Sequence, residues 1–196
     1  MLLLTLLLAT GGSDLKTTLK NAEGADFWIE MVPGGQPQAA HGAGIAEVPL
    51  ETVAPILRDV DHFKEIFPQM TESRLMSRAG RIISAHIGVV IIGFGGAARI
   101  PLSADIKQLE GHDDSGAITF RQRTAGNSSF KRYDIDVRLT PLSPTRTLIE
   151  MWGNAIPDIP FVPDSLIEDE NRKLVRRGVR ALRLRAAGAK FDPNTL

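Results

Sequence analysis

Cysteine is absent from this chain of 196 residues, which excludes disulfide bonds, thiolate metal sites and cysteine nucleophiles. Histidine is scarce as well, because the chain has only four, and no two of them have the close spacing of a zinc-binding pair. They are His41, His62, His86 and His112. We therefore predict no metal site and no cofactor.

An excess of either charge is also lacking, since 23 Lys and Arg residues balance 23 Asp and Glu residues. Nothing global therefore indicates a nucleic-acid partner. Residues 2–9 are nearly all apolar but far too few to span a bilayer. They resemble the apolar core of a secretory signal, with small residues at 9–12 for cleavage, although no Lys or Arg precedes them. We expect a periplasmic or secreted protein, with a cytoplasmic one as the alternative.

The length and the hydrophobic fraction of 43% fit one domain with a sizeable core. We expect a signal-like segment over residues 1–12 and a linker or a short helix over 13–25. The domain then covers 26–188 and a tail covers 189–196.

Alternating apolar and polar residues dominate the middle of the chain and predict strands with one wet face. In 99–109 the apolar face holds Ile100, Leu102 and Ile106, and in 130–139 it holds Tyr133, Ile135 and Val137. The predicted strands are 27–32, 44–48, 72–77, 81–92, 99–109, 117–124, 130–139 and 145–153. Two short helices, 49–59 and 61–67, follow the second strand, and Pro55 should kink or break the first of them.

One long amphipathic helix, 164–187, closes the chain. Ser165 and Glu168 fit a capping box at its start. At 100° per residue one face is largely apolar and the other is basic. The sheet-facing residues are Ile167, Asn171, Leu174, Val175, Gly178 and Leu182, and the water-facing residues are Arg172, Lys173, Arg176, Arg177, Arg180 and Arg183. Gly178 either widens a cavity or hinges a lid, or it lets the helix pack closely on a strand.

A single helix covering an antiparallel sheet is an α+β architecture, and its details resemble the helix-grip fold of the START (StAR-related lipid-transfer) domains. The residues that carry the resemblance are 48–53 with 57–59, Phe63, 67–68, 72–75 and the proline-bearing segment 156–160. Wider relatives of these domains include polyketide cyclases and Bet v 1-type proteins. The resemblance implies a curved sheet that grips the C-terminal helix, a deep apolar cavity between the two, and a lid made by the helix and nearby loops.

The inward faces supply the residues expected to contact a ligand in such a cavity. They are Ile100, Leu102, Ile106, Phe120, Tyr133, Ile135, Val137, Met151, Leu174, Gly178 and Leu182. Polar groups that could orient a ligand are Tyr133, His86, Glu150, Arg121 and Arg123, although the two arginines alternate with apolar residues and should face water. Glu150 lies outside if Ile149 and Met151 face in, and is a buried carboxylate if Leu148 and Trp152 face in.

The leading hypothesis is a monomeric, non-enzymatic carrier that binds and transfers a hydrophobic ligand, lipid or sterol-like. The alternative is an enzyme of the polyketide cyclase or dehydratase type that uses the same cavity, with His86 as acid or base. A third reading is a regulatory module whose interior is filled by side chains. The apolar segment 89–94 could contact a membrane at a hairpin tip, or it could be buried beneath a loop or a lid.

Overall fold

The computed structural model describes residues 12–24, 27–67, 69–93 and 98–189. The predicted signal-like segment lies outside these residues except for its last position, and the tail lies outside except for residue 189. Among the described residues, no helix combines the length and the apolar character that crossing a bilayer requires.

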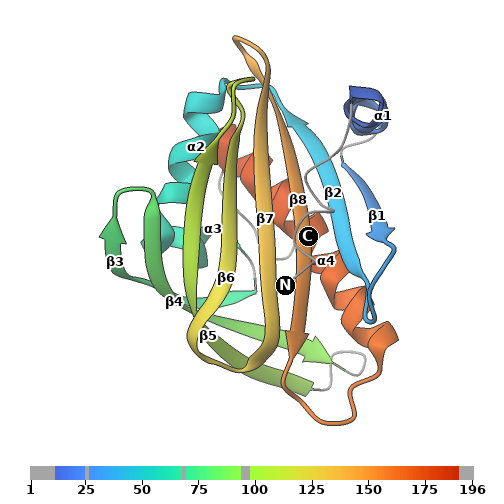
Figure 1. Ribbon diagram of the computed structural model, residues 1–196, viewed down its shortest axis with the longest axis vertical. Helices are drawn as coiled ribbons and strands as arrows, with labels where there is room; N and C mark the ends of the chain where they lie inside the picture. The colour runs from blue at the N-terminus through green and yellow to red at the C-terminus, as the bar shows by residue number, and fades with distance from the viewer. Residues whose placement is uncertain (1–11, 25–26, 68, 94–97, 190–196) are drawn as a thin grey trace.

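Eight antiparallel strands form one curved sheet, in the order β1-β2-β8-β7-β6-β5-β4-β3 (Figure 1). Each predicted strand is present, and several are longer than expected. The strands are β1 (Trp28–Val32), β2 (Ala39–Ala46), β3 (Met70–Ala79), β4 (Ile82–Gly93), β5 (Ala98–His112), β6 (Ile118–Ser128), β7 (Phe130–Ser143) and β8 (Arg146–Pro157). Consecutive strands from β3 to β8 are paired neighbours, and the crossover from β2 places β1 and β2 beside β8.

Three helical segments link β2 to β3, namely α2 (Leu50–Arg58), the 3-10 turn η1 (Val60–His62) and α3 (Phe63–Ile66). Of the kink or break expected at Pro55, the break is wrong, because α2 runs through this residue. A further helix, α1 (Gly12–Glu23), precedes the sheet. Figure 1 shows α1 near β2, well away from α2.

The long helix α4 (Asp164–Ala186) packs across β2 and β8 on the same side of the sheet as α2 and α3 (Figure 1). Two strand glycines allow the close approach. A Cβ on Gly42 would lie 2.7 Å from Val175 Cγ1, and one on Gly153 would lie 2.9 Å from Val175 Cγ2. Real Cβ atoms do not tolerate such distances, so these glycines let the sheet grip the helix.

The start of α4 differs from the prediction in one detail. Pro163 occupies the N-cap position and makes no side-chain cap, so the capping box of Ser165 and Glu168 is wrong. Glu168 instead accepts a hydrogen bond from the backbone N–H of Gln38, at 2.9 Å. The α+β helix-grip architecture itself is confirmed.

The two faces of the sheet have separate cores. The larger one lies between the concave face and helices α2, α3 and α4, with Phe63, Phe120 and Leu182 fully buried in it. The smaller one lies on the opposite face, where Ala22 of α1 packs on Ala43, Ile45 and Leu148.

Candidate functional site

A cavity of about 90 Å³ lies within the larger core, between the sheet and α4. Strands β6, β7 and β8 form one wall, α4 forms the opposite wall, and the end of α2, α3 and the adjoining parts of β3 and β4 complete it. The lining residues are Leu57, Phe63, Phe67, Gln69, Met70, Val89, Val90, Ile91, Gln122, Phe130, Tyr133, Ile135, Val137, Met151, Ala155, Glu170, Asn171, Leu174, Arg177 and Gly178.

The cavity brings together part of the set predicted from sequence. Six of these residues line it, namely Tyr133, Ile135, Val137, Met151, Leu174 and Gly178. The others do not reach it: Leu102, Ile106, Phe120 and Leu182 are buried in the core, and Ile100 packs against that core. They belong to the core on the concave face as expected, but they do not line this cavity.

Sequence reasoning missed the contribution of the short helices and of the β3–β4 end. Leu57 is the last residue but one of α2, Phe63 begins α3, and Met70 begins β3. In the sequence, Phe63 stands out only through the resemblance to START domains. Its apolar character signals burial, but no sequence period connects these helices to the strands that they face.

Exposure divides the wall into an interior and a mouth. Tyr133, Ile135 and Val137 are buried, whereas Met70, Ile91 and several other lining residues are only half-buried. The half-buried set is Phe67, Gln69, Met70, Val89, Val90, Ile91, Ala155, Glu170, Leu174 and Arg177. These residues come from α4, from the region around α3, β3 and β4 and, in the case of Ala155, from β8, and we assign them to the mouth of the cavity.

Tyr133 supplies the one hydroxyl group among the described lining residues. Its side chain is buried, its ring packs edge-on against Phe130 at 5.4 Å between centroids, and among the described residues its hydroxyl has no hydrogen-bond partner. Burial raises the pKa of Tyr133 well above its ordinary value, so the hydroxyl keeps its proton.

A chain of amides also reaches the cavity wall. Gln122 donates through Nε2 to Gln108 Oε1 at 2.7 Å, and Gln108 donates to the carbonyl of Leu57 at 2.7 Å. The remaining amide oxygen of Gln122 has no described partner. Both glutamines are buried, so this relay ties α2 to the sheet and leaves one acceptor at the cavity wall.

Arg177 lies on the cavity wall and not on the water-facing side of α4, so its predicted placement is wrong. It forms no ion pair or hydrogen bond within the described residues. The other charged lining residue, Glu170, is paired with Lys173 Nζ at 2.8 Å. Both polar atoms of the Asn171 side chain are hydrogen bonded: Oδ1 accepts from the Ala155 N–H, and Nδ2 donates to the Gln38 carbonyl.

Gly178 combines the two roles that the sequence left open. A Cβ at this position would meet Met151, whose Cε would lie 2.9 Å away. The glycine therefore permits close packing of Met151 on α4. Because both residues also line the cavity, that packing sets the width of the cavity at this point.

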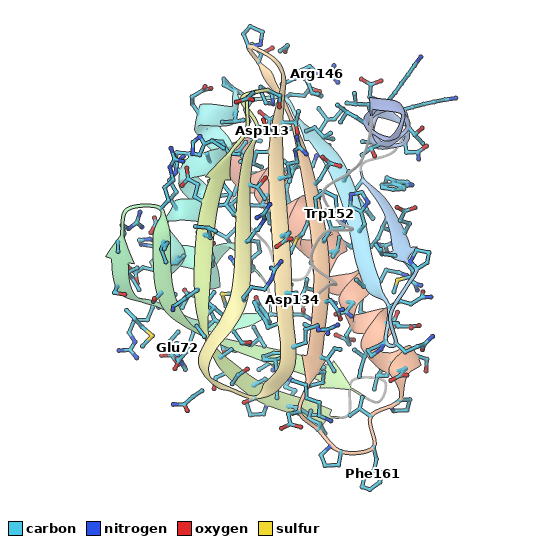
Figure 2. All side chains as sticks on the ribbon, in the orientation of Figure 1. Glu72, Asp113, Asp134, Arg146, Trp152 and Phe161 are labelled. Atoms are coloured by element: carbon cyan, nitrogen blue, oxygen red, sulfur yellow. The ribbon has the colours of Figure 1, made fainter. Side chains whose placement is uncertain are left out.

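His86 lies outside the cavity. It points to the opposite face of the sheet from Ala85 and Ile87, and its Nδ1 is 2.7 Å from Oδ1 of Asp105, its cross-strand neighbour. Arg123 is on that same outer face, where its Nη2 donates to Asp136 Oδ2 at 3.0 Å. Figure 2 shows Asp134, which also pairs with Arg123, on this outer side of β7.

The register of β8 is now fixed. Ile149 and Met151 belong to the concave core, so Glu150 lies on the outer face, yet it is only 7% exposed. His41 Nε2 approaches Glu150 Oε1 at 3.6 Å, and the His41 ring stacks on Trp152 at 4.2 Å. Burial on the outer face was not foreseen, because it involves His41 of the neighbouring strand β2, which the sequence of β8 does not reveal.

The apolar hairpin end is described only in part. Phe94 lies outside the described residues, whereas Val89, Val90 and Ile91 line the cavity. The most exposed large apolar side chain among the described residues is Phe161, in the loop between β8 and α4. It is fully exposed, has a φ of 62°, and projects away from the body of the protein (Figure 2).

Of the comparisons with known proteins, the one with solved structures identifies the fold. No protein-family model matches the sequence, and a search of curated proteins found no match. Among solved structures, a STAR-related lipid transfer protein from Xanthomonas axonopodis is similar with a TM-score of 0.69 and 16% identity, over 83% of this chain and 94% of that one. Human StAR-related lipid transfer protein 5 gives 0.64 and 12%, over 89% and 96%.

An aromatase/cyclase, Zhui from Streptomyces sp. R1128, is also similar, with a TM-score of 0.54 and 15% identity over 82% of this chain and 94% of that one. At such identities the likeness establishes the fold. The chain has the START helix-grip fold.

Proposed function

We propose that this protein binds a hydrophobic ligand, lipid or sterol-like, in the cavity between the sheet and α4, and carries it from one environment to another. The observation that supports this most directly is the cavity itself, a largely apolar hollow within the larger core. The START fold shared with lipid-transfer proteins supports the same function.

The physical chemistry of the wall fits a ligand of this kind. Each methylene group moved from water to an apolar interior gains about 0.8 kcal/mol, so a long chain needs little polar chemistry for affinity. Ordering of the ligand and of the wall offsets part of that gain. A few polar groups then suffice to orient the ligand, and the wall offers Tyr133, Gln122 and Arg177.

A cyclase-type enzyme is the second candidate, and the similarity to an aromatase/cyclase supports it. Proton transfer needs a group whose charge can change near neutral pH. None of the four histidines lines the cavity within the described residues, and His86 is on the far face of the sheet. Glu170 is the described carboxylate on the wall, and it is held by Lys173. We therefore favour the carrier.

Filling the cavity tests the proposal. Ala155 faces Tyr133 across β7 and β8 and lines the cavity, so Ala155→Phe places a ring in the hollow. Ala79→Phe adds the same ring at an exposed position at the end of β3 and is the matched control. Binding of a dansyl-labelled fatty acid is measured by fluorescence, and native mass spectrometry of the mildly purified wild type looks for a bound lipid.

We expect the wild type and Ala79→Phe to bind the probe alike and Ala155→Phe to bind it at least tenfold more weakly. Overpacking costs about 1–3 kcal/mol of stability, so thermal unfolding must show that Ala155→Phe is folded at the assay temperature. If it is not, Ala155→Leu replaces it. If folded Ala155→Phe and the wild type bound the probe equally well, the ligand would not bind in this cavity, and the proposal would be wrong.

The predictions on export, on membrane contact through segment 89–94 and on the monomeric state stay predictions. Analytical ultracentrifugation checks the last of these directly.

A further inference from the structure

The polar groups of the cavity wall define the ligand further, and this inference rests on the proposed function. The first of them is the Tyr133 hydroxyl in the interior. The Tyr133 oxygen is not among the fully buried unpaired atoms, so it borders the cavity space, and the described residues give it no hydrogen-bond partner. Sealing such a hydroxyl from water without a partner is unfavourable. A ligand with nothing but hydrocarbon at this point would seal the hydroxyl away from water without replacing its hydrogen bond.

An acceptor lies close to this donor. Gln122 pairs with Ile135 in the register between β6 and β7, and Tyr133 is two residues from Ile135 on the same inward face. Such diagonal neighbours have Cβ atoms roughly 7–8 Å apart, within reach of long side chains. Because Gln122 Nε2 is committed to Gln108, its amide oxygen is the free group. A ligand hydroxyl between the two side chains could accept from Tyr133 and donate to Gln122.

The second polar group is Arg177 at the mouth. Its guanidinium has no carboxylate partner within the described residues, whereas the nearby acid Glu170 already pairs with Lys173. Residues seven apart on a helix are about 10 Å apart along its axis, so Glu170 and Arg177 border separate parts of the mouth. The part beside Arg177 therefore has unbalanced positive charge and forked donors suited to a carboxylate or a phosphate.

We propose that the ligand is an anionic amphiphile with a second oxygen function at its buried end. Its carboxylate or phosphate pairs with Arg177 at the mouth, and its apolar body packs against Ile135, Val137 and Leu174. Its inner hydroxyl or carbonyl forms a hydrogen bond with the Tyr133 hydroxyl. Plain fatty acyl chains and neutral lipids each satisfy one half of this site and leave the other unpaired.

Four probes that differ only at their ends test the proposal: dodecanoic acid, 12-hydroxydodecanoic acid, dodecan-1-ol and dodecane-1,12-diol. Each is titrated against the dansyl-labelled fatty acid bound to the wild type, Tyr133→Phe, Arg177→Gln and the control Arg172→Gln. Arg172 is exposed on the same helix and away from the cavity. Dodecyl phosphate is added as a fifth probe, to compare a phosphate with a carboxylate.

We expect the hydroxy acid to bind the wild type most tightly, about tenfold better than dodecanoic acid, which is the effect of one buried hydrogen bond. Tyr133→Phe should abolish that advantage and leave dodecanoic acid unchanged. Arg177→Gln should abolish the preference of acids over alcohols and keep the hydroxyl advantage, and Arg172→Gln should alter neither.

Equal affinities for the four probes in the wild type, or rankings that both variants leave intact, would overturn this inference while the carrier function stands. Failure of every probe to displace the dansyl-labelled fatty acid, together with equal binding by Ala155→Phe and Ala79→Phe, would overturn the proposed function and the inference with it.

Discussion

Neutralising Glu110 should destabilise the protein at neutral pH and have little effect in acid. Glu110 of β5 accepts two hydrogen bonds from Arg58 at the end of α2, at 2.6 and 2.8 Å, and its Oε1 is 2.7 Å from Nε2 of His112. The pair matters for the cavity because Leu57, the neighbour of Arg58, forms part of the wall. Glu110→Gln keeps the shape of the side chain and removes its charge.

The size of the effect follows from the carboxylate's pKa. Hydrogen bonds from Arg58, and to a lesser extent from His112, lower the pKa of Glu110 from 4.5 to about 2 against the opposing effect of burial. At about 1.36 kcal/mol for each tenfold change in acidity, this difference corresponds to an upper limit of about 3 kcal/mol. Because the Arg58 side chain is 37% exposed, solvent screens the pair, and we expect about 1–2 kcal/mol.

The dependence on pH has a definite sign. A carboxylate whose pKa is lower in the folded state stabilises the fold fully above pH 4.5, and this stabilisation is lost as the pH falls toward 2. Urea unfolding of the wild type and Glu110→Gln should therefore show a gap of about 1–2 kcal/mol at pH 7 that narrows steadily between pH 5 and pH 3. Glu72→Gln, on the exposed side of β3, is the control. A gap of the same size at pH 7 and pH 3 would refute the reasoning.

Two glycine substitutions should test separately the close packing of α4 on the sheet and the width of the cavity. Gly42→Ala forces its Cβ against Val175 Cγ1 and the backbone oxygen of Trp28, so thermal unfolding should show a loss of about 1–3 kcal/mol, and an unchanged Tm would contradict the close packing. Gly178→Ala should change stability by less than about 1 kcal/mol, because helix propensity offsets the shift of the flexible Met151 side chain. That shift should weaken binding of the dansyl-labelled fatty acid about fourfold, which is the free energy of burying one methylene group. Unchanged affinity would show that Met151 does not set the width of the cavity.

The outline of the fold could be predicted because long periodic segments have a strong signal. The closing helix was expected over 164–187 and spans Asp164–Ala186, and the alternation in 99–109 and 130–139 marked β5 and β7 correctly. The sequence signal for local details, such as the exact start of a helix, was weaker. Pro163 takes the N-cap position that a capping box would have given to Ser165, and the sequence does not rank these competing starts.

The sequence predicts which strand residues face the helices, but not which of them border a cavity, because that depends on the side chains that pack opposite each strand. Phe120 and Val137 are cross-strand neighbours with the same inward orientation, yet only Val137 reaches the cavity. Arg177 is at the border of the two faces of the helical wheel. Its placement depends on how far α4 is rotated against the sheet, and Val175 fixes that rotation by packing on Gly42 and Gly153.

That same packing bears on how a guest could enter. Lifting α4 off the sheet would break both hydrogen bonds of the buried Asn171 and the bond from Arg183 to the Ile45 carbonyl, at a cost of about 1 kcal/mol or more each. It would also expose Val175, which is fully buried. A ligand that passes the half-buried wall around Met70 and Ile91 breaks none of these contacts. The grip therefore favours an α4 that stays in place as one wall, while the side chains around the mouth move aside.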